Sequence, residues 1–95
     1  MFERNGATIR NIAEVLWETP PEHYDAHSKM LVTPASHATK FHDFRISSYQ
    51  PKGYVAPHTH RVQEQIYHFL EGEGLMELDG ERRVVGRHDT VFIPP

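Results

Sequence analysis

The chain has 95 residues, which suits one small domain with a modest core. Hydrophobic residues make up 38%, and no apolar run approaches the roughly 18 residues of a membrane span, so we expect no membrane protein. The formal net charge is −3 without a basic stripe, which argues against nucleic-acid binding. The absence of cysteine excludes disulfides and thiolate metal ligands and fits a cytoplasmic protein.

Residues 1–40 carry little regular pattern and are treated as a lead-in segment. The apolar residues of 9–16 have the spacing of one face of a short helix, which we expect to end before Pro20-Pro21. Residues 28–32 favour a short strand. No basic region leads into an apolar run at the N-terminus, so we expect no signal peptide.

From Phe41 onward, short apolar and β-branched runs alternate with glycine and proline signals. The expected strands are residues 44–49, a segment through 58–60, 65–70, 75–78, 82–85 and 90–93. The expected turns are residues 50–53, 61–63, 71–74, 79–80 and 86–89. Asp79-Gly80 is a strong hairpin signal, because the type I′ turn requires positive φ angles. The pattern predicts an all-β protein, either a barrel or a sandwich.

His58 and His60 are the most informative pair of residues. On a strand, side chains two positions apart share one face, whereas on a helix they would point about 200° apart. The β-favouring sequence around them therefore predicts two imidazoles directed to one point. A transition-metal ion can bind to such a pair.

The segment from Gly53 to Gly72 resembles the first motif of the cupin superfamily, whose members are small jelly-roll barrels. That motif reads Gly, about five residues, His-x-His, about three or four residues, Glu, about six residues, Gly. Residues 88–95 resemble the beginning of the second cupin motif. The resemblance covers residues 41–95. It implies a small antiparallel β-barrel of jelly-roll (cupin) type, within a single cupin domain over residues 1–95.

The chain departs from the cupin pattern in three ways. Gly53 and His58 are one residue closer together than in the motif, and His88 stands where the second motif begins with glycine. The sequence also stops at Pro95, before the histidine that supplies the fourth protein ligand in cupins. We therefore expect a barrel that is incomplete at its C-terminus, and a histidine four residues past Pro95 in the full gene.

Two adjacent residues compete for the position of the motif glutamate. Glu64 satisfies the spacing on one side only, whereas Gln65 satisfies it on both sides. If Gln65 faces inward on a strand, Tyr67 and Phe69 share its face and would line a substrate pocket. Some small cupins have glutamine at this position. We favour Gln65 as the third metal ligand and keep Glu64 as the alternative.

The resemblance implies one divalent metal ion, with Fe, Mn, Ni and Zn not distinguished, bound by His58, His60 and Gln65. Because these ligands are neutral, a bound ion would attract a small polar molecule that carries a carboxylate. Arg45 is a further candidate for the substrate pocket. The alternative interpretation, that it is a solvent-exposed arginine on a strand, is at least as well supported. The expected reaction is a dioxygenation, decarboxylation, isomerisation or lyase reaction, and no catalytic residue is assigned. The alternative is a non-catalytic cupin that binds or senses a small molecule.

We also expect a homodimer. Ile66 and Leu70 lie on the strand face opposite Gln65, where they would be exposed unless a partner covers them.

Overall fold

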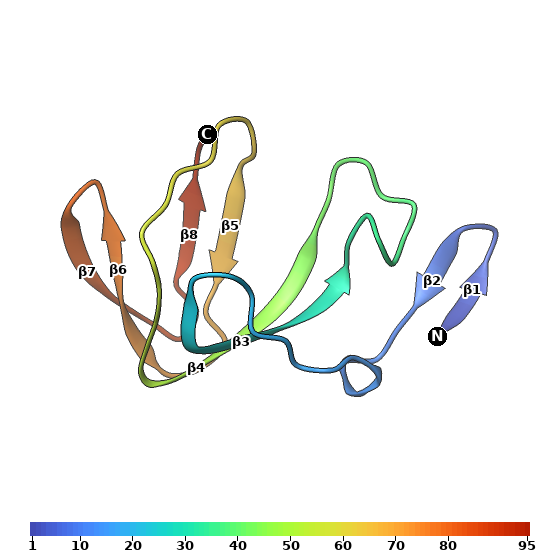
Figure 1. Cartoon of the computed structure of the whole chain (residues 1–95), viewed down its shortest axis with the longest axis horizontal. Helices are drawn as coiled ribbons and strands as arrows, with labels where there is room; N and C mark the ends of the chain where they lie inside the picture. Colours follow the sequence, from blue (N-terminus) through green and yellow to red (C-terminus); the bar gives the residue numbers. More distant parts are fainter. The chain divides into compact units, whose positions relative to one another are not determined.

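The computed structural model describes all of residues 1–95 and divides them into two compact units, Met1–Ala56 and Pro57–Pro95. The chain is 52% strand and 3% helix, which confirms the all-β prediction. Every strand pair is antiparallel, and the strands form four two-stranded sheets, none of which closes into a barrel (Figure 1). This agrees with the expected incomplete barrel. The single-domain organisation over 1–95 stays a prediction.

The first unit begins with a hairpin of β1 (Phe2–Arg4) and β2 (Ala7–Ile9). Its turn residues Asn5 and Gly6 have φ angles of 52° and 84°. Two positive φ angles are what a type I′ turn requires, and Asn-Gly is its preferred sequence. The expectation of little regular structure here was therefore wrong, and the Asn-Gly pair was the signal for this hairpin.

The helix expected over residues 9–16 is reduced to one 3-10 turn, η1 (Ile12–Glu14). Asn11 caps it, and the Glu14 carboxylate accepts the Asn11 N–H in return at 2.6 Å. The ammonium group of Met1 lies 2.8 Å from Glu14 and, together with the Asn11 N–H, lowers the pKa of that carboxyl. The prediction of a longer helix was wrong because its first apolar residue belongs to β2 instead. No helix in the structure is long and apolar enough to span a membrane.

Two long antiparallel strands, β3 (His23–Val32) and β4 (Phe44–Val55), form the centre of the first unit. Ser28 has no exposed surface, and its hydroxyl lies 2.7 Å from that of Ser47 on the opposite strand. Ala26 is also fully buried. The pairing of the two hydroxyls satisfies polar groups that would otherwise be costly to bury.

The turn expected at residues 50–53 is a bulge within β4. Ala26 pairs with Tyr49 and Tyr24 pairs with Tyr54, so four residues of β4 lie opposite the single residue Asp25. A Cβ atom at Gly53 would collide with the backbone carbonyl oxygen of Asp25. Glycine therefore permits the two backbones to approach at this point. The glycine and proline signals were correctly located, but they produce a bulge instead of a chain reversal.

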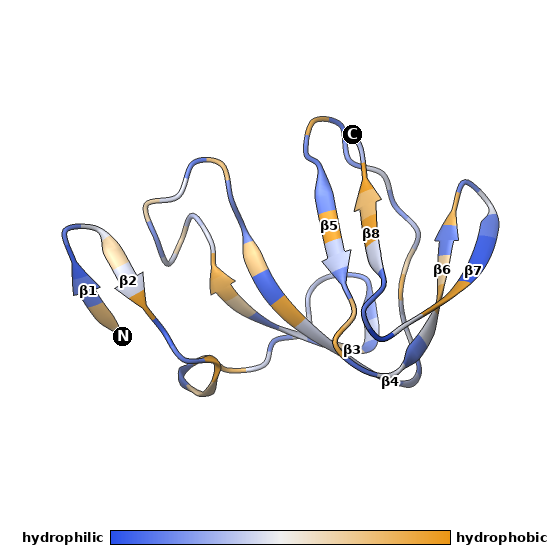
Figure 2. Ribbon diagram, turned by 180° about the vertical axis from the view of Figure 1, so that it is seen from behind, coloured by the Kyte–Doolittle hydropathy of each residue, from blue (hydrophilic) through white to orange (hydrophobic).

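In the second unit, β6 (Glu73–Leu78) and β7 (Glu81–Gly86) form the predicted hairpin. The turn residues Asp79 and Gly80 have φ angles of 50° and 80°, as the type I′ turn requires. Met76 pairs with Arg83 and Glu77 with Arg82, so the two predicted strands pair across this turn. Figure 2 shows hydrophilic residues at the start of β7.

The other sheet of the second unit pairs β5 (Gln65–His68) with β8 (Thr90–Ile93). The last strand has the predicted bounds, and it appears in Figure 2 as a mainly hydrophobic element. Gln65 lies opposite Ile93, so the first residue of β5 is close to the end of β8 (Figure 1). This pairing places Gln65 at one end of the sheet, directly after the loop that carries the two histidines.

Candidate metal centre

His58 and His60 lie in the loop before β5, and the prediction of a strand through them was wrong. No strand is assigned between β4 and β5. Pro57 has no N–H to donate to a neighbouring strand, which disfavours regular pairing at the start of this loop. The two imidazoles nevertheless approach each other, with ring centroids 4.8 Å apart and planes inclined by 82°. The loop, and not the alternation of a strand, brings the two rings together.

Gln65 connects this loop to the sheet. Its side-chain oxygen Oε1 lies 3.0 Å from Nε2 of His60, and the contact is partly buried. Because Gln65 is the first residue of β5, its backbone is held by the pairing with β8. The structure therefore brings His58, His60 and Gln65 into one group through direct contacts between their side chains.

β5 ends at His68, so the strand predicted to reach Leu70 was too long, but the exposure of side chains alternates along β5 and the residues next to it. Gln65, Tyr67 and Phe69 are half-buried, whereas Glu64 is exposed and Ile66 is 70% exposed. The structure contains no group of three His, Cys, Asp or Glu side chains that could hold a metal ion, so Glu64 does not complete such a group with the two histidines. Burial and contact both favour Gln65 over Glu64 as the residue next to the histidines.

Arg45 lies on β4 in the first unit, where its guanidinium contacts Asp43. It donates to one carboxylate oxygen from Nε and Nη2, each at 3.0 Å, and to the other oxygen from Nη2 at 3.1 Å. Both side chains are exposed. Arg45 is thus occupied by a surface ion pair, and its role in a substrate pocket stays a prediction.

The face of β5 opposite Gln65 holds a different contact. Nδ1 of His68 lies 2.7 Å from the hydroxyl of Thr90, its cross-strand partner, and the ring of His88 is 6.2 Å from that of His68. His68 therefore contributes to the pairing of β5 with β8. The alternation of the strand separates it from Gln65, as the sequence indicated.

The donor atoms of the group suit a divalent ion. Imidazole nitrogen and amide oxygen are both metal ligands, and two such ligands bound at about 2.1 Å and at right angles are about 3.0 Å apart. The observed separation of His60 Nε2 and Gln65 Oε1 is also 3.0 Å. The residues present thus fit a metal ion, which would take the place of the hydrogen bond between them.

Comparison with known proteins identifies the family. Residues 45–95, more than half of the chain, match the cupin domain. The chain belongs to the cupin family. The matched part of this cupin contains the loop histidines, Gln65 and both sheets of the second unit.

One curated relative of this cupin is an uncharacterized protein of Methanocaldococcus jannaschii, which is 53% identical over 38 residues. The similarity covers 40% of the cupin chain and 30% of the relative, so the chain spans less than a third of the relative's length. No solved structure matches the chain. The comparisons thus establish the family of this protein.

Proposed function

We propose that this cupin binds one divalent metal ion through His58, His60 and Gln65 and acts on a small molecule that carries a carboxylate. The observation that supports this most is the 3.0 Å contact between His60 Nε2 and Gln65 Oε1, with the ring of His58 beside it. When bound, the ion would supply Lewis acidity, or dioxygen activation if it is redox-active. The donor set suits Fe, Mn, Ni and Zn alike.

The charge of the ligands supports an anionic substrate. Two neutral imidazoles and one neutral amide leave the charge of a divalent cation uncompensated, whereas a carboxylate ligand would cancel part of it. The positive charge that remains attracts a substrate carboxylate. Tyr67 lies on the same face of β5 as Gln65, and Phe69 follows directly after the strand. Both side chains are half-buried, and we propose that they form the apolar wall that limits access of water.

Arg45, which lies in the first unit, would bind a substrate carboxylate only after its ion pair with Asp43 opens. That pair is exposed, and exposed ion pairs typically stabilise a protein by about 1 kcal/mol or less. A substrate carboxylate is able to compete for the guanidinium at that small energetic cost. Arg45 therefore stays a candidate for binding a substrate carboxylate.

We further propose that the cupin is a cytoplasmic homodimer. Ile66 and Phe92 lie opposite each other on β5 and β8, and they are 70% and 51% exposed. Two apolar side chains on one exposed face favour burial against a second copy. The cytoplasm is the compartment that a chain without cysteine fits.

A substrate panel tests the catalytic part of the proposal. The protein is loaded in turn with Fe(II), Mn(II), Ni(II) and Zn(II) and incubated with small mono- and dicarboxylates, with and without dioxygen. We expect turnover with at least one metal, and loss of that turnover in His60→Ala. Saturable carboxylate binding without turnover would instead make the protein a binding module. No effect of any metal on binding or turnover would contradict the proposal.

A further inference from the structure

His37, in the connection between β3 and β4, has a buried ring nitrogen without a partner. Its Nε2 atom is inaccessible to solvent and makes no hydrogen bond. Buried polar atoms in native proteins almost always have a hydrogen-bond partner, so an unpartnered nitrogen needs an explanation.

The other nitrogen of the same ring is well held. Nδ1 of His37 lies 2.8 Å from the hydroxyl oxygen of Ser36. That oxygen also accepts the N–H of Thr33 and lies near the Thr33 hydroxyl, each at 3.1 Å. The contacts form a turn that fixes the orientation of the imidazole. A metal-binding histidine is typically oriented in this way, by a hydrogen bond from its second nitrogen.

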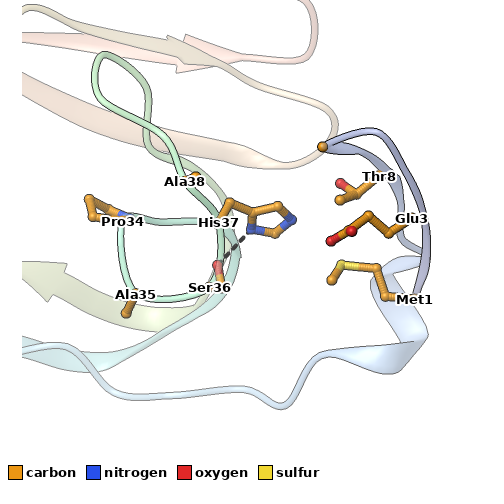
Figure 3. Close-up of a pocket in the computed structure, with 9 residues that line it drawn as sticks. Met1, Glu3, Thr8, Pro34, Ala35, Ser36, His37 and Ala38 are labelled. Atoms are coloured by element: carbon orange, nitrogen blue, oxygen red, sulfur yellow. Dashed lines mark hydrogen bonds between the residues drawn. The ribbon is translucent and has the colours of Figure 1, made fainter.

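The ring of His37 extends into a cavity of about 250 Å³ between this turn and the β1–β2 hairpin. Figure 3 shows the imidazole directed toward the side chains of Glu3, Thr8 and Met1. Glu3 is the acidic side chain among the lining residues, and no lysine or arginine lines the cavity. The ammonium group of the lining residue Met1 is paired with Glu14. The side chains around it therefore favour a cation.

We propose that this cavity is a second binding site, for a divalent transition-metal ion held by Nε2 of His37 and the carboxylate of Glu3. Imidazole and carboxylate together suit ions such as Zn²⁺ and Ni²⁺. The hydroxyl of Thr8 is a further oxygen atom in the lining of the same cavity. The site lies in the first unit and does not depend on the proposed centre at His60.

Zinc titration of the full chain tests the site. The background is the double variant His58→Ala/His60→Ala, in which the proposed first centre is removed. Isothermal titration with zinc chloride should still show one binding event in this background. Adding His37→Ala should weaken that event by about tenfold or more, as the loss of one of two ligands requires. Adding His42→Ala, which removes an exposed histidine from the same connection, should leave it unchanged.

Two further variants distinguish ligation from a structural role. Ser36→Ala should weaken zinc binding by about tenfold, and by less than His37→Ala, because Ser36 acts only by orienting the His37 ring. Glu3→Gln changes an exposed side chain, so it tests the site even if His37→Ala fails to fold. Nitrogen NMR should show zinc shifting Nε2 of His37 and not Nδ1. Equal zinc binding by the background, its Glu3→Gln form and its His42→Ala form, with no shift of Nε2, would overturn the proposal.

Discussion

The side-chain oxygen of Gln65 lies 3.0 Å from Nε2 of His60, which joins a loop histidine to the first residue of β5. Without a metal, Nε2–H donates to the amide oxygen. Ligation requires Nε2 to be free of its proton, so the ring must place its proton on Nδ1 instead. The contact therefore holds two metal donors together in a form that a bound ion can replace.

The neutral character of Gln65 should set the strength of metal binding. Gln65→Glu places a carboxylate where the amide oxygen now lies, and it should tighten binding of a divalent ion by about tenfold or more, equivalent to about 1.4 kcal/mol. Glu64→Gln, which changes an exposed neighbour, should have little effect. Metal titration of both variants checks this. A larger effect at position 64 than at 65 would contradict the ligand assignment.

The turn of the β6–β7 hairpin should be sensitive to a side chain at Gly80. Its φ of 80° lies in the left-handed region, which costs other residues about 1–2 kcal/mol. Gly80→Ala should lower the free energy of unfolding by about that amount, although a Cβ there meets no atom within 4 Å. Gly74→Ala is the matched control, because Gly74 is on the same hairpin and has no positive φ. Denaturant unfolding of both variants measures the difference, and equal stabilities would refute the explanation.

The hairpins show where local sequence is sufficient to predict the fold. Asp79-Gly80 gave the β6–β7 turn and its register, and Asn5-Gly6 carried the same signal for β1–β2. Residues 50–53 carried equally clear signals and yet formed a bulge. The difference depends on the partner strand, because pairing of β4 with β3 continues on both sides of the bulge. Such pairing between distant segments is not encoded in a local pattern.

The bulge should depend on the missing side chain of Gly53. A Cβ atom at this position collides with the backbone oxygen of Asp25, and a backbone atom cannot move away as a flexible side chain can. Gly53→Ala should therefore lower the free energy of unfolding of the first unit by about 1–3 kcal/mol. Gly86→Ala introduces a Cβ at an ordinary contact distance of 3.6 Å and should have a much smaller effect. Thermal unfolding of the two variants provides the comparison.

The proposed dimer should depend on the exposed apolar face of β5 and β8. Ile66→Lys places a charge in the middle of that face and should shift the protein from dimer to monomer, since burying an unpaired charge is costly. Val62→Lys changes a side chain that is 88% exposed in the preceding loop, and it should leave the dimer intact. Sedimentation across micromolar concentrations measures both. A wild-type protein that remains monomeric throughout would contradict the proposal.

The site was predictable in composition but not in its local structure. Spacing alone favoured Gln65 over Glu64, and the observed burial along β5 supports the same choice. The strand predicted through His58 and His60 is a loop. The two rings nevertheless approach each other, so their proximity does not depend on the alternation of a strand. No spacing pattern in the sequence pairs His37 with another metal-binding residue, and only the fold brings Glu3 into the same cavity.

The metal content of purified variants tests the central claim most directly. Elemental analysis of the wild-type protein should find about one divalent ion per chain in addition to the ion that His37→Ala removes. We assign this additional ion to the proposed centre at His58, His60 and Gln65. His58→Ala and His60→Ala should lose that ion while keeping the circular-dichroism spectrum of the wild type. Gln65→Ala should retain less of the ion than the wild type, whereas Glu64→Ala should retain all of it. Full retention of metal in both histidine variants would contradict the account.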